Sequence, residues 1–218
     1  IGYDPLTTNE VDRALALALQ SNDKALSSAD NHSPALVEVL SIERYDAPKT
    51  NKTKAGVAAA TMARRGEVYL YDYSTDTLLH TIVDLASNTV QQEEFHGVQL
   101  PLTVNEKAHA LELVRADAPL WGTLASRFQT ITGTELRTTD QLQVKISLFL
   151  GESMPDQVNA AARQCGEHRC AQILLFTVDR IVLEVIPIVD LSRGQVVQLL
   201  SDSWTMPSPA TATEGSGT

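Results

Sequence analysis

The chain has 218 residues, 43% of them hydrophobic, and this apolar content excludes disorder over most of its length. It carries 17 Lys and Arg residues against 27 Asp and Glu residues, which gives a formal net charge of −10. Such a surface repels phosphate and argues against nucleic acid or anionic membranes as partners. The longest apolar stretch, residues 181–191, is far shorter than the roughly 20 residues that span a bilayer, so no membrane span is expected.

The first half of the chain begins with a helical pattern that is followed by strands. Thr7 and Glu10 form a capping-box pattern, and an apolar stripe at helical spacing runs from Val11 to Leu19. Alternating or β-branched segments then predict strands at residues 37–43, 67–73, 78–85 and 90–95.

One predicted strand has a tyrosine-rich face. Val68 and Leu70 alternate with Tyr69, Tyr71 and Tyr73, so one face is aliphatic and the other aromatic. We interpret the aromatic face as a packing surface for a helix or a neighbouring domain. A ligand-stacking platform is the alternative.

The second half begins with two helical patterns. Thr103 and Glu106 repeat the capping-box pattern, and a helix is predicted over residues 104–114. Pro119 interrupts the pattern, and a second helix then includes Leu120 and Phe128. Strands are predicted at residues 141–150, 172–178 and 181–191, with a short helix within residues 155–165.

A repeated segment organises the chain. Residues 82–90 match residues 188–196 at five of nine positions, with an offset of 106. Nearly the same offset aligns a helix and two further strands, so we expect two copies of one α+β unit. In each copy a helix packs on a curled antiparallel sheet, which is a cystatin-like arrangement. We place the first domain at residues 1–115, the second at 116–202, and a Pro/Ser/Thr/Gly-rich tail or linker at 203–218.

The two cysteines, Cys165 and Cys170, lie close together in a polar segment that contains Gly166. The spacing predicts an intrachain disulfide; a free thiol pair or half of a metal site are the alternatives. Asn31 and Asn51 each begin an N-glycosylation sequon in a polar, loop-like stretch. Cysteines and sequons together favour an exported protein, secreted or periplasmic.

Residues that could carry chemistry also have simpler structural interpretations. Asp84 and Asp190 occur once per repeat and are candidate acids, but a strand-end Asp commonly accepts hydrogen bonds from turn amides. His80 and His96 lie on neighbouring predicted strands and form a candidate metal pair, although hydrogen-bonded strand-edge histidines are far commoner. The sequence contains no glycine-rich phosphate loop and no Gly-x-Ser-x-Gly motif. We therefore expect no catalytic, cofactor-binding or metal-binding residue in this chain.

Motifs spread over residues 4–200 carry a resemblance to a known family. In chain order they are Asp4-Pro5-Leu6-Thr7 with Glu10, Ile42-Glu43 with Pro48-Lys49, Pro101-Leu102 with Glu106, Val114-Arg115-Ala116-Asp117, Leu124-Ala125-Ser126-Arg127, and Ile186-Pro187-Ile188-Val189-Asp190-Leu191 with Val196-Val197. They resemble the second and third N-terminal domains of copper amine oxidases. The family's Pro-x-x-Gly spacer before the final Val-Asp-Leu is missing here.

The resemblance implies a division of labour between domains. In that family the two domains flank the catalytic domain and help shape its surface and the approach to its active site. The catalytic domain oxidises primary amines with a copper ion, held by three histidines, and a quinone made from a tyrosine in an Asn-Tyr context. This sequence has no His-x-His pair and no Asn-Tyr dipeptide, so no catalytic residue can be carried over.

Three hypotheses follow. The first is a non-catalytic N-terminal domain pair that supports or associates with an amine-oxidising catalytic domain absent from this chain, or with another protein chain, and homo-oligomerisation is left open. The second is a free-standing secreted binding module that uses the tyrosine face or the hollow of a sheet. The third is a small cone-shaped α+β enzyme with Asp84 or Asp190 as its base.

Overall fold

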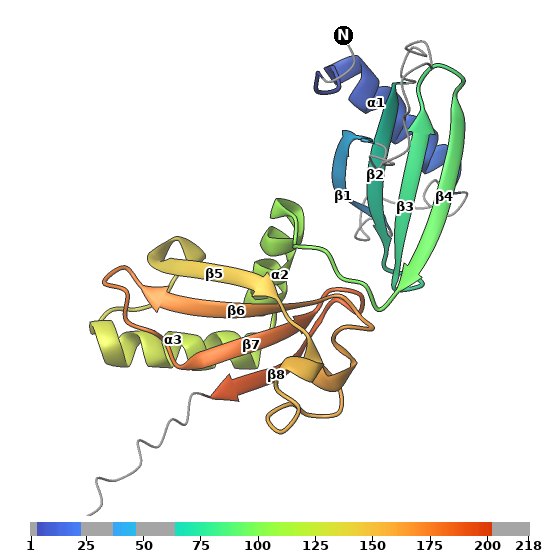
Figure 1. Cartoon of the computed structure of the whole chain (residues 1–218). Helices are drawn as coiled ribbons and strands as arrows, with labels where there is room; N and C mark the ends of the chain where they lie inside the picture. The colour runs from blue at the N-terminus through green and yellow to red at the C-terminus, as the bar shows by residue number, and fades with distance from the viewer. Residues whose placement is uncertain (1–3, 23–36, 47–63, 202–218) are drawn as a thin grey trace, which may run out of the picture.

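The computed structural model describes residues 4–22, 37–46 and 64–201, which form two α+β domains (Figure 1). Each domain has a four-stranded antiparallel sheet with strands in sequence order, β1-β2-β3-β4 and β5-β6-β7-β8. The expected α+β class, with helices packed on antiparallel sheets, is confirmed. Asn31, Asn51 and the predicted tail lie outside the described residues.

The first domain packs one helix on its sheet. The elements are α1 (Thr8–Gln20), β1 (Val37–Arg44), β2 (Arg65–Asp72), β3 (Thr77–Asp84) and β4 (Thr89–His96). Ala14 and Ala18 of α1 are fully buried among the aliphatic side chains of the sheet. Gly66 allows this close approach, because a Cβ there would lie 2.8 Å from the Cβ of Ala14.

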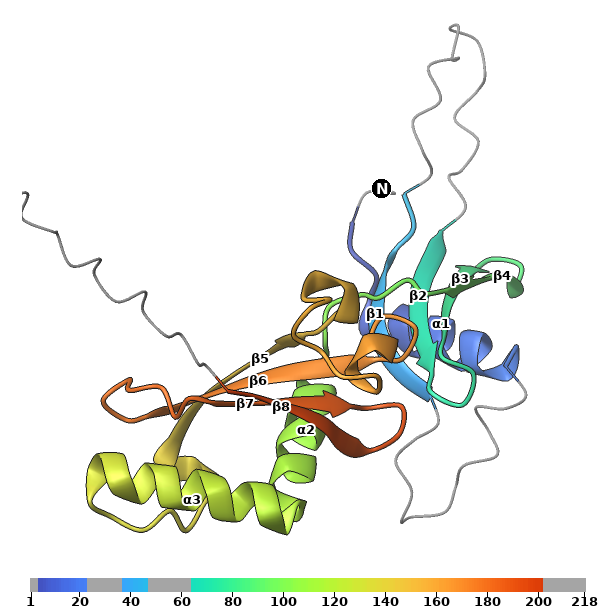
Figure 2. The same cartoon turned by 90° about the horizontal axis from the view of Figure 1, so that it is seen from below.

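The second domain packs two helices on its sheet. The elements are α2 (Val104–Ala116), α3 (Ala118–Thr132), β5 (Leu142–Leu148), β6 (Cys170–Thr177), β7 (Val185–Asp190) and β8 (Gln195–Ser201). Leu120, Leu124 and Phe128 of α3 join the same buried cluster as Ile173 and Leu175 of β6. The two views in Figures 1 and 2 show both helices on one side of this sheet.

The junction between the domains differs from the boundary expected at residues 115/116. Ala110 and Val114 of α2 are fully buried in the core of the second sheet, so this helix belongs to the second domain. The chain therefore crosses between the domains within residues 97–103, which follow β4 and precede α2. Asp117 ends α2 and caps α3 by accepting a hydrogen bond from the Leu120 amide, so the break at Pro119 is a helix–helix corner.

The repeated segments occupy equivalent places. The first forms the end of β3 and its turn, the second the end of β7 and its turn, and each is the third strand of its sheet. Both turns contain a residue with positive φ at the same offset, Asn88 at 57° and Gly194 at 63°.

Two expected elements are shorter than predicted. The strand expected at residues 181–191 begins only at Val185, because Arg180 and Glu184 both adopt positive φ and break the extended backbone. Within residues 155–165 only a 3₁₀ turn forms, Ala162–Gln164. Among the described residues, no helix combines the length and apolar character of a bilayer span.

Candidate functional site

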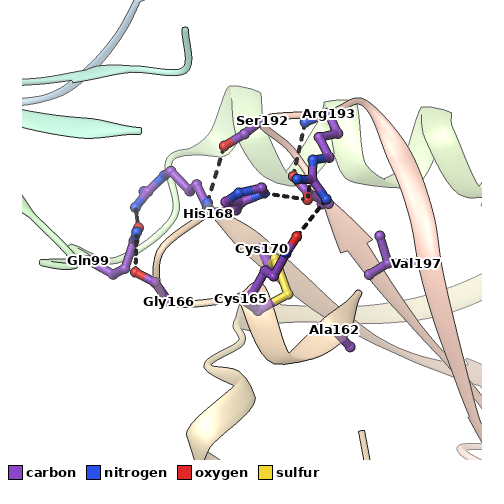
Figure 3. Close-up of a disulfide and its surroundings, with 12 residues drawn as sticks. Gln99, Ala162, Cys165, Gly166, His168, Cys170, Ser192, Arg193 and Val197 are labelled. Atoms are coloured by element: carbon purple, nitrogen blue, oxygen red, sulfur yellow. Dashed lines mark hydrogen bonds and ion pairs between the residues drawn. A yellow bond between two sulfur atoms is a disulfide. The ribbon is translucent and has the colours of Figure 1, made fainter. Parts of the chain in front are cut away.

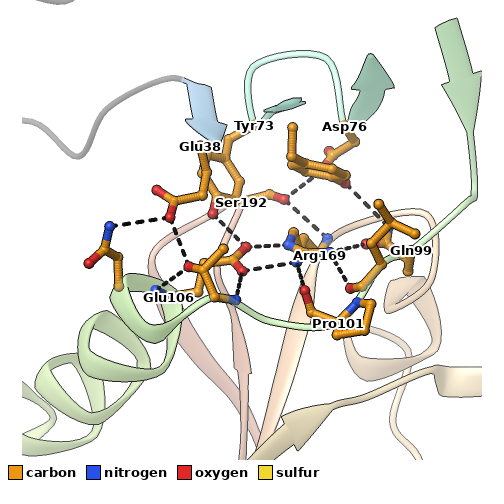
Figure 4. Close-up of polar contacts among 12 residues, drawn as sticks. Glu38, Tyr73, Asp76, Gln99, Pro101, Glu106, Arg169 and Ser192 are labelled. Atoms are coloured by element: carbon orange, nitrogen blue, oxygen red, sulfur yellow. Dashed lines mark hydrogen bonds and ion pairs between the residues drawn. The ribbon is translucent and has the colours of Figure 1, made fainter. Parts of the chain in front are cut away.

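The most developed cluster of polar side chains lies between the two domains and centres on Arg169 (Figure 4). Arg169 immediately precedes β6, and its side chain is 0% exposed. A fully buried guanidinium is costly unless its charge and all its donors are satisfied. We call the residues around it the interdomain junction: Glu38, Tyr71, Tyr73, Asp76, Gln99, Leu100, Pro101, Glu106, His168, Arg169, Asp190 and Ser192.

Glu106 balances the charge of Arg169. The Nε of Arg169 donates to Oε1 of Glu106, and Nη2 donates to Oε2 at 2.9 Å, so the pair is bidentate. Glu106 is the third residue of α2, and its Oε2 also accepts from the Thr103 amide at 2.7 Å. A helix-capping carboxylate therefore also serves as the counterion of a buried cation.

The remaining donors of Arg169 hold the interdomain segment. Its Nη1 donates to Oε1 of Gln99 at 3.1 Å and to the Leu100 carbonyl at 3.0 Å. Its Nη2 donates to the Pro101 carbonyl at 3.0 Å. With the two bonds to Glu106, these contacts use all five N–H groups of the guanidinium.

The first domain closes the junction with two tyrosines. The Tyr73 hydroxyl donates to Oε1 of Glu106 at 2.8 Å, and the guanidinium carbon of Arg169 lies 5.1 Å from the ring centroid of Tyr71. The interpretation of the tyrosine face as a surface for a neighbouring domain is thus confirmed for Tyr71 and Tyr73. Tyr69 instead stacks on His80, with ring centroids 4.6 Å apart.

Burial and charge determine the ionisation of these groups. Burial opposes ionisation of Glu106, but the hydrogen bonds and positive charge of Arg169 outweigh it and hold the pKa of Glu106 below its usual value. Burial, followed by the charge of Glu106, raises the pKa of Tyr73. Burial likewise raises the pKa of Tyr71. At physiological pH, Arg169 and Glu106 therefore form an ion pair, and Tyr71 and Tyr73 are neutral.

A second part of the junction surrounds His168 (Figure 3). Its Nδ1 lies 2.9 Å from Oδ2 of Asp190, and its Nε2 lies 3.9 Å from Oδ2 of Asp76 in the first domain. The Ser192 hydroxyl donates to Oδ1 of Asp76. Serine, histidine and aspartate are the residue types of a hydrolase triad, but here the serine hydroxyl bonds a carboxylate rather than the imidazole. The Asp76–Ser192 hydrogen bond therefore joins the two domains.

The structure joins Cys165 and Cys170 in a disulfide, with Cα atoms 5.4 Å apart (Figure 3). The bond closes the short loop that carries His168 and Arg169. Within this loop, the Gly166 carbonyl accepts a hydrogen bond from Nε2 of Gln99 at 3.0 Å. The disulfide thus constrains the segment that contacts the first domain.

The repeated aspartates have the structural role expected of a strand-end Asp. Asp84 accepts hydrogen bonds from the amides of Ala86 and Ser87 at 3.0 and 3.1 Å, and the Ser87 amide is the main cause of its lowered pKa. Asp190 accepts from the Arg193 amide at 2.9 Å. Asp190 also faces His168, whereas Asp84 pairs with Arg65.

The two candidate metal histidines have different partners. Nε2 of His80 lies 2.7 Å from Oε1 of Glu67, whereas Nδ1 of His96 lies 3.3 Å from the Thr77 hydroxyl. In the sheet register His80 faces Glu93, and His96 faces Thr77. Within the described part of the chain, no three His, Cys, Asp or Glu side chains gather in a metal-binding arrangement.

Sequence reasoning missed Arg169 and Glu106 as a pair. They lie 63 positions apart, and no periodic pattern connects them. The available signals were local: a capping glutamate, and an arginine between a histidine and a cysteine at the start of a buried strand.

Comparisons with known proteins give a structural likeness. No protein-family model and no curated protein sequence matches the chain significantly. Its structure is similar to a copper-containing benzylamine oxidase from Hansenula Polymorpha, with a TM-score of 0.57 and 13% sequence identity. The likeness covers 92% of this chain, which spans 30% of that oxidase chain. At this identity it concerns the fold.

Proposed function

We propose that this chain is the non-catalytic N-terminal domain pair of a copper amine oxidase-like protein. The observation that carries the proposal is the structural likeness, which includes both domains and covers under a third of the oxidase chain. In this proposal a catalytic domain outside this sequence oxidises primary amines and holds the copper and the tyrosine-derived quinone. The disulfide and the two sequons support a secreted or periplasmic location.

The junction supports a role as one rigid unit. Removing one partner of a buried ion pair typically costs about 3–5 kcal/mol, because it leaves an uncompensated charge. Separation of the domains would leave the Arg169–Glu106 pair intact, but it would break the Tyr73–Glu106 hydrogen bond and remove the Tyr71 ring from Arg169. The two domains therefore present one fixed surface to the catalytic domain, rather than two surfaces that move independently.

The alternative, a free-standing secreted binding module, loses much of its tyrosine face. Tyr71 is fully buried and Tyr73 is bonded to Glu106, so two of the three tyrosines are used within the chain. The domain-pair proposal accounts for both residues without an external ligand.

The proposal is tested on the native protein that contains this sequence. An affinity-purified native preparation should contain stoichiometric copper, stain for a redox-cycling quinone and release hydrogen peroxide from a panel of primary amines. The recombinant 218-residue chain should show none of these properties. Native protein that ends with this chain, and co-purifies with no oxidase, would overturn the proposal.

A further inference from the structure

The edge of β4 that faces away from β3 is suited to bind a further strand. β4 pairs with β3 along all eight of its residues without a register shift. Among the described residues, no strand pairs with its other edge. Figures 1 and 2 show β4 on the side of the first domain away from the second sheet. Its backbone amides and carbonyls are a template for an added strand.

The other sheet edges carry features that hinder strand addition. β1 has a register shift between Val39 and Ser41, and β8 has one at Val197, opposite Ile188 and Val189 of β7. β5 has the exposed Lys145 at its centre. Bulges and edge lysines are devices that prevent pairing with another chain. β4 has neither.

The face of the sheet opposite α1 adds an aromatic row. Tyr69 stacks on His80, and His80 lies 6.4 Å from the Phe95 ring. The three rings lie on β2, β3 and β4, so the row ends at the free edge. Phe95, at that end, is 38% exposed. An added strand would therefore meet an exposed aromatic ring.

Carboxylates surround this row. Glu43 lies directly opposite Glu67 in the β1–β2 register, and like charges in this position are destabilising. Glu93 is 73% exposed, and Glu94 beside it is also exposed. Glu93 and Glu94 point to opposite faces of the sheet, because side chains alternate along a strand. Basic residues on a strand added at the β4 edge would lie beside Glu93 and Glu94 and attract them.

We propose that the β4 edge binds an extended segment of another protein that contains two adjacent basic residues and a neighbouring aromatic residue. In an added strand, the basic residues lie opposite Glu93 and Glu94, one on each face. The aromatic residue lies opposite Phe95. Backbone hydrogen bonds supply affinity, and these three side chains supply specificity.

The test uses a fluorescently labelled eight-residue peptide of Thr and Val with a central Phe-Arg-Arg-Phe, which fits either strand direction. Fluorescence anisotropy with the full chain should show saturable binding. The E93K/E94K variant should bind about tenfold more weakly, because two attractive cross-strand pairs become repulsive. The E112K/E152K variant, with the same change in net charge at exposed sites elsewhere, should bind like the wild type.

Two further measurements make the proposal falsifiable. A peptide with N-methylated backbone amides should not bind, and a Phe-Glu-Glu-Phe peptide should prefer E93K/E94K over the wild type. Equal binding of the N-methylated peptide, or equal loss of binding in E112K/E152K, would show general charge attraction and overturn the proposal. Wild-type dimers in sedimentation that E93K/E94K abolishes would instead assign the edge to a second copy of this chain.

Discussion

The two capping glutamates, Glu10 of α1 and Glu106 of α2, show how burial changes the role of one local motif. Each is the third residue of a helix, bonds the amide of a preceding threonine and pairs with an arginine from a distant segment. The Arg64–Glu10 pair remains partly open to solvent, with side chains 29% and 24% exposed. The Arg169–Glu106 pair is 0% and 2% exposed. The first pair supports one helix, whereas the second lies within the second domain and contacts Tyr71 and Tyr73 of the first domain.

The largest expected loss of stability distinguishes the buried pair from the open pair. Arg169→Met should lower the free energy of unfolding by about 3–5 kcal/mol, because it leaves Glu106 buried without its counterion. The matched variant Arg64→Met should have a much smaller effect, since solvent screens its partner. Urea unfolding followed by circular dichroism measures both. Equal losses in the two variants would contradict the distinction between the pairs.

Combining the Arg169→Met and Glu106→Leu substitutions sharpens the same comparison. The double variant should recover a large part of the stability lost in Arg169→Met, because no buried charge remains. The angle between the domains should nevertheless become less uniform, which small-angle scattering would detect as a broader distribution of distances. If the double variant is as unstable as Arg169→Met, the lost stability comes from packing rather than from a buried charge.

Removing the disulfide tests how much the Cys165–Cys170 loop, which carries Arg169, contributes to stability. The double substitution Cys165→Ser and Cys170→Ser should lower the free energy of unfolding by about 2 kcal/mol, as expected for a short closed loop. Intact mass should first show a gain of two protons when the wild type is reduced. Alkylation of both thiols in the native, unreduced protein would show that the bond is not formed.

Tyr73→Phe probes the first domain's contribution to the junction. Loss of its hydrogen bond to the buried Glu106 should cost about 1–2 kcal/mol in urea unfolding. The matched variant Tyr69→Phe removes a 3.1 Å hydrogen bond to Glu67, at a site outside the junction. It should cost about 0.5 kcal/mol or less. A larger loss of stability in Tyr69→Phe than in Tyr73→Phe would indicate that the junction is not tightly packed.

The smallest effect concerns the open pair and its pH dependence. Arg64 lowers the pKa of Glu10 from 4.5 to about 2, with help from the amide of Thr7. Ionised Glu10 therefore stabilises the fold above pH 4.5, and this contribution disappears as the pH falls from 4.5 to 2. The difference in denaturation midpoint between wild type and Glu10→Gln should shrink over this window and disappear as the pH falls below 2. A difference at pH 2 as large as the difference above pH 4.5 would contradict the assignment.

Local sequence patterns predicted most elements but not the junction. Capping boxes at Thr7 and Thr103 located the starts of α1 and α2, and alternation around Tyr69 located β2. The domain boundary was misplaced because a capping box marks where a helix begins and not which sheet it covers. The pairing of Arg169 with Glu106 depends on how two finished domains meet, which no short-range periodicity encodes.

The two sides of the junction are synthesised at different times. Tyr71 and Tyr73 leave the ribosome about 100 residues before Arg169, an interval of roughly 5–20 s at ordinary elongation rates. During this time we expect the first domain to fold with both rings uncovered, as a transient aromatic surface for a chaperone. Stalled nascent chains that end before Arg169 should therefore have both tyrosines open to iodination, and chains that include β8 should protect them.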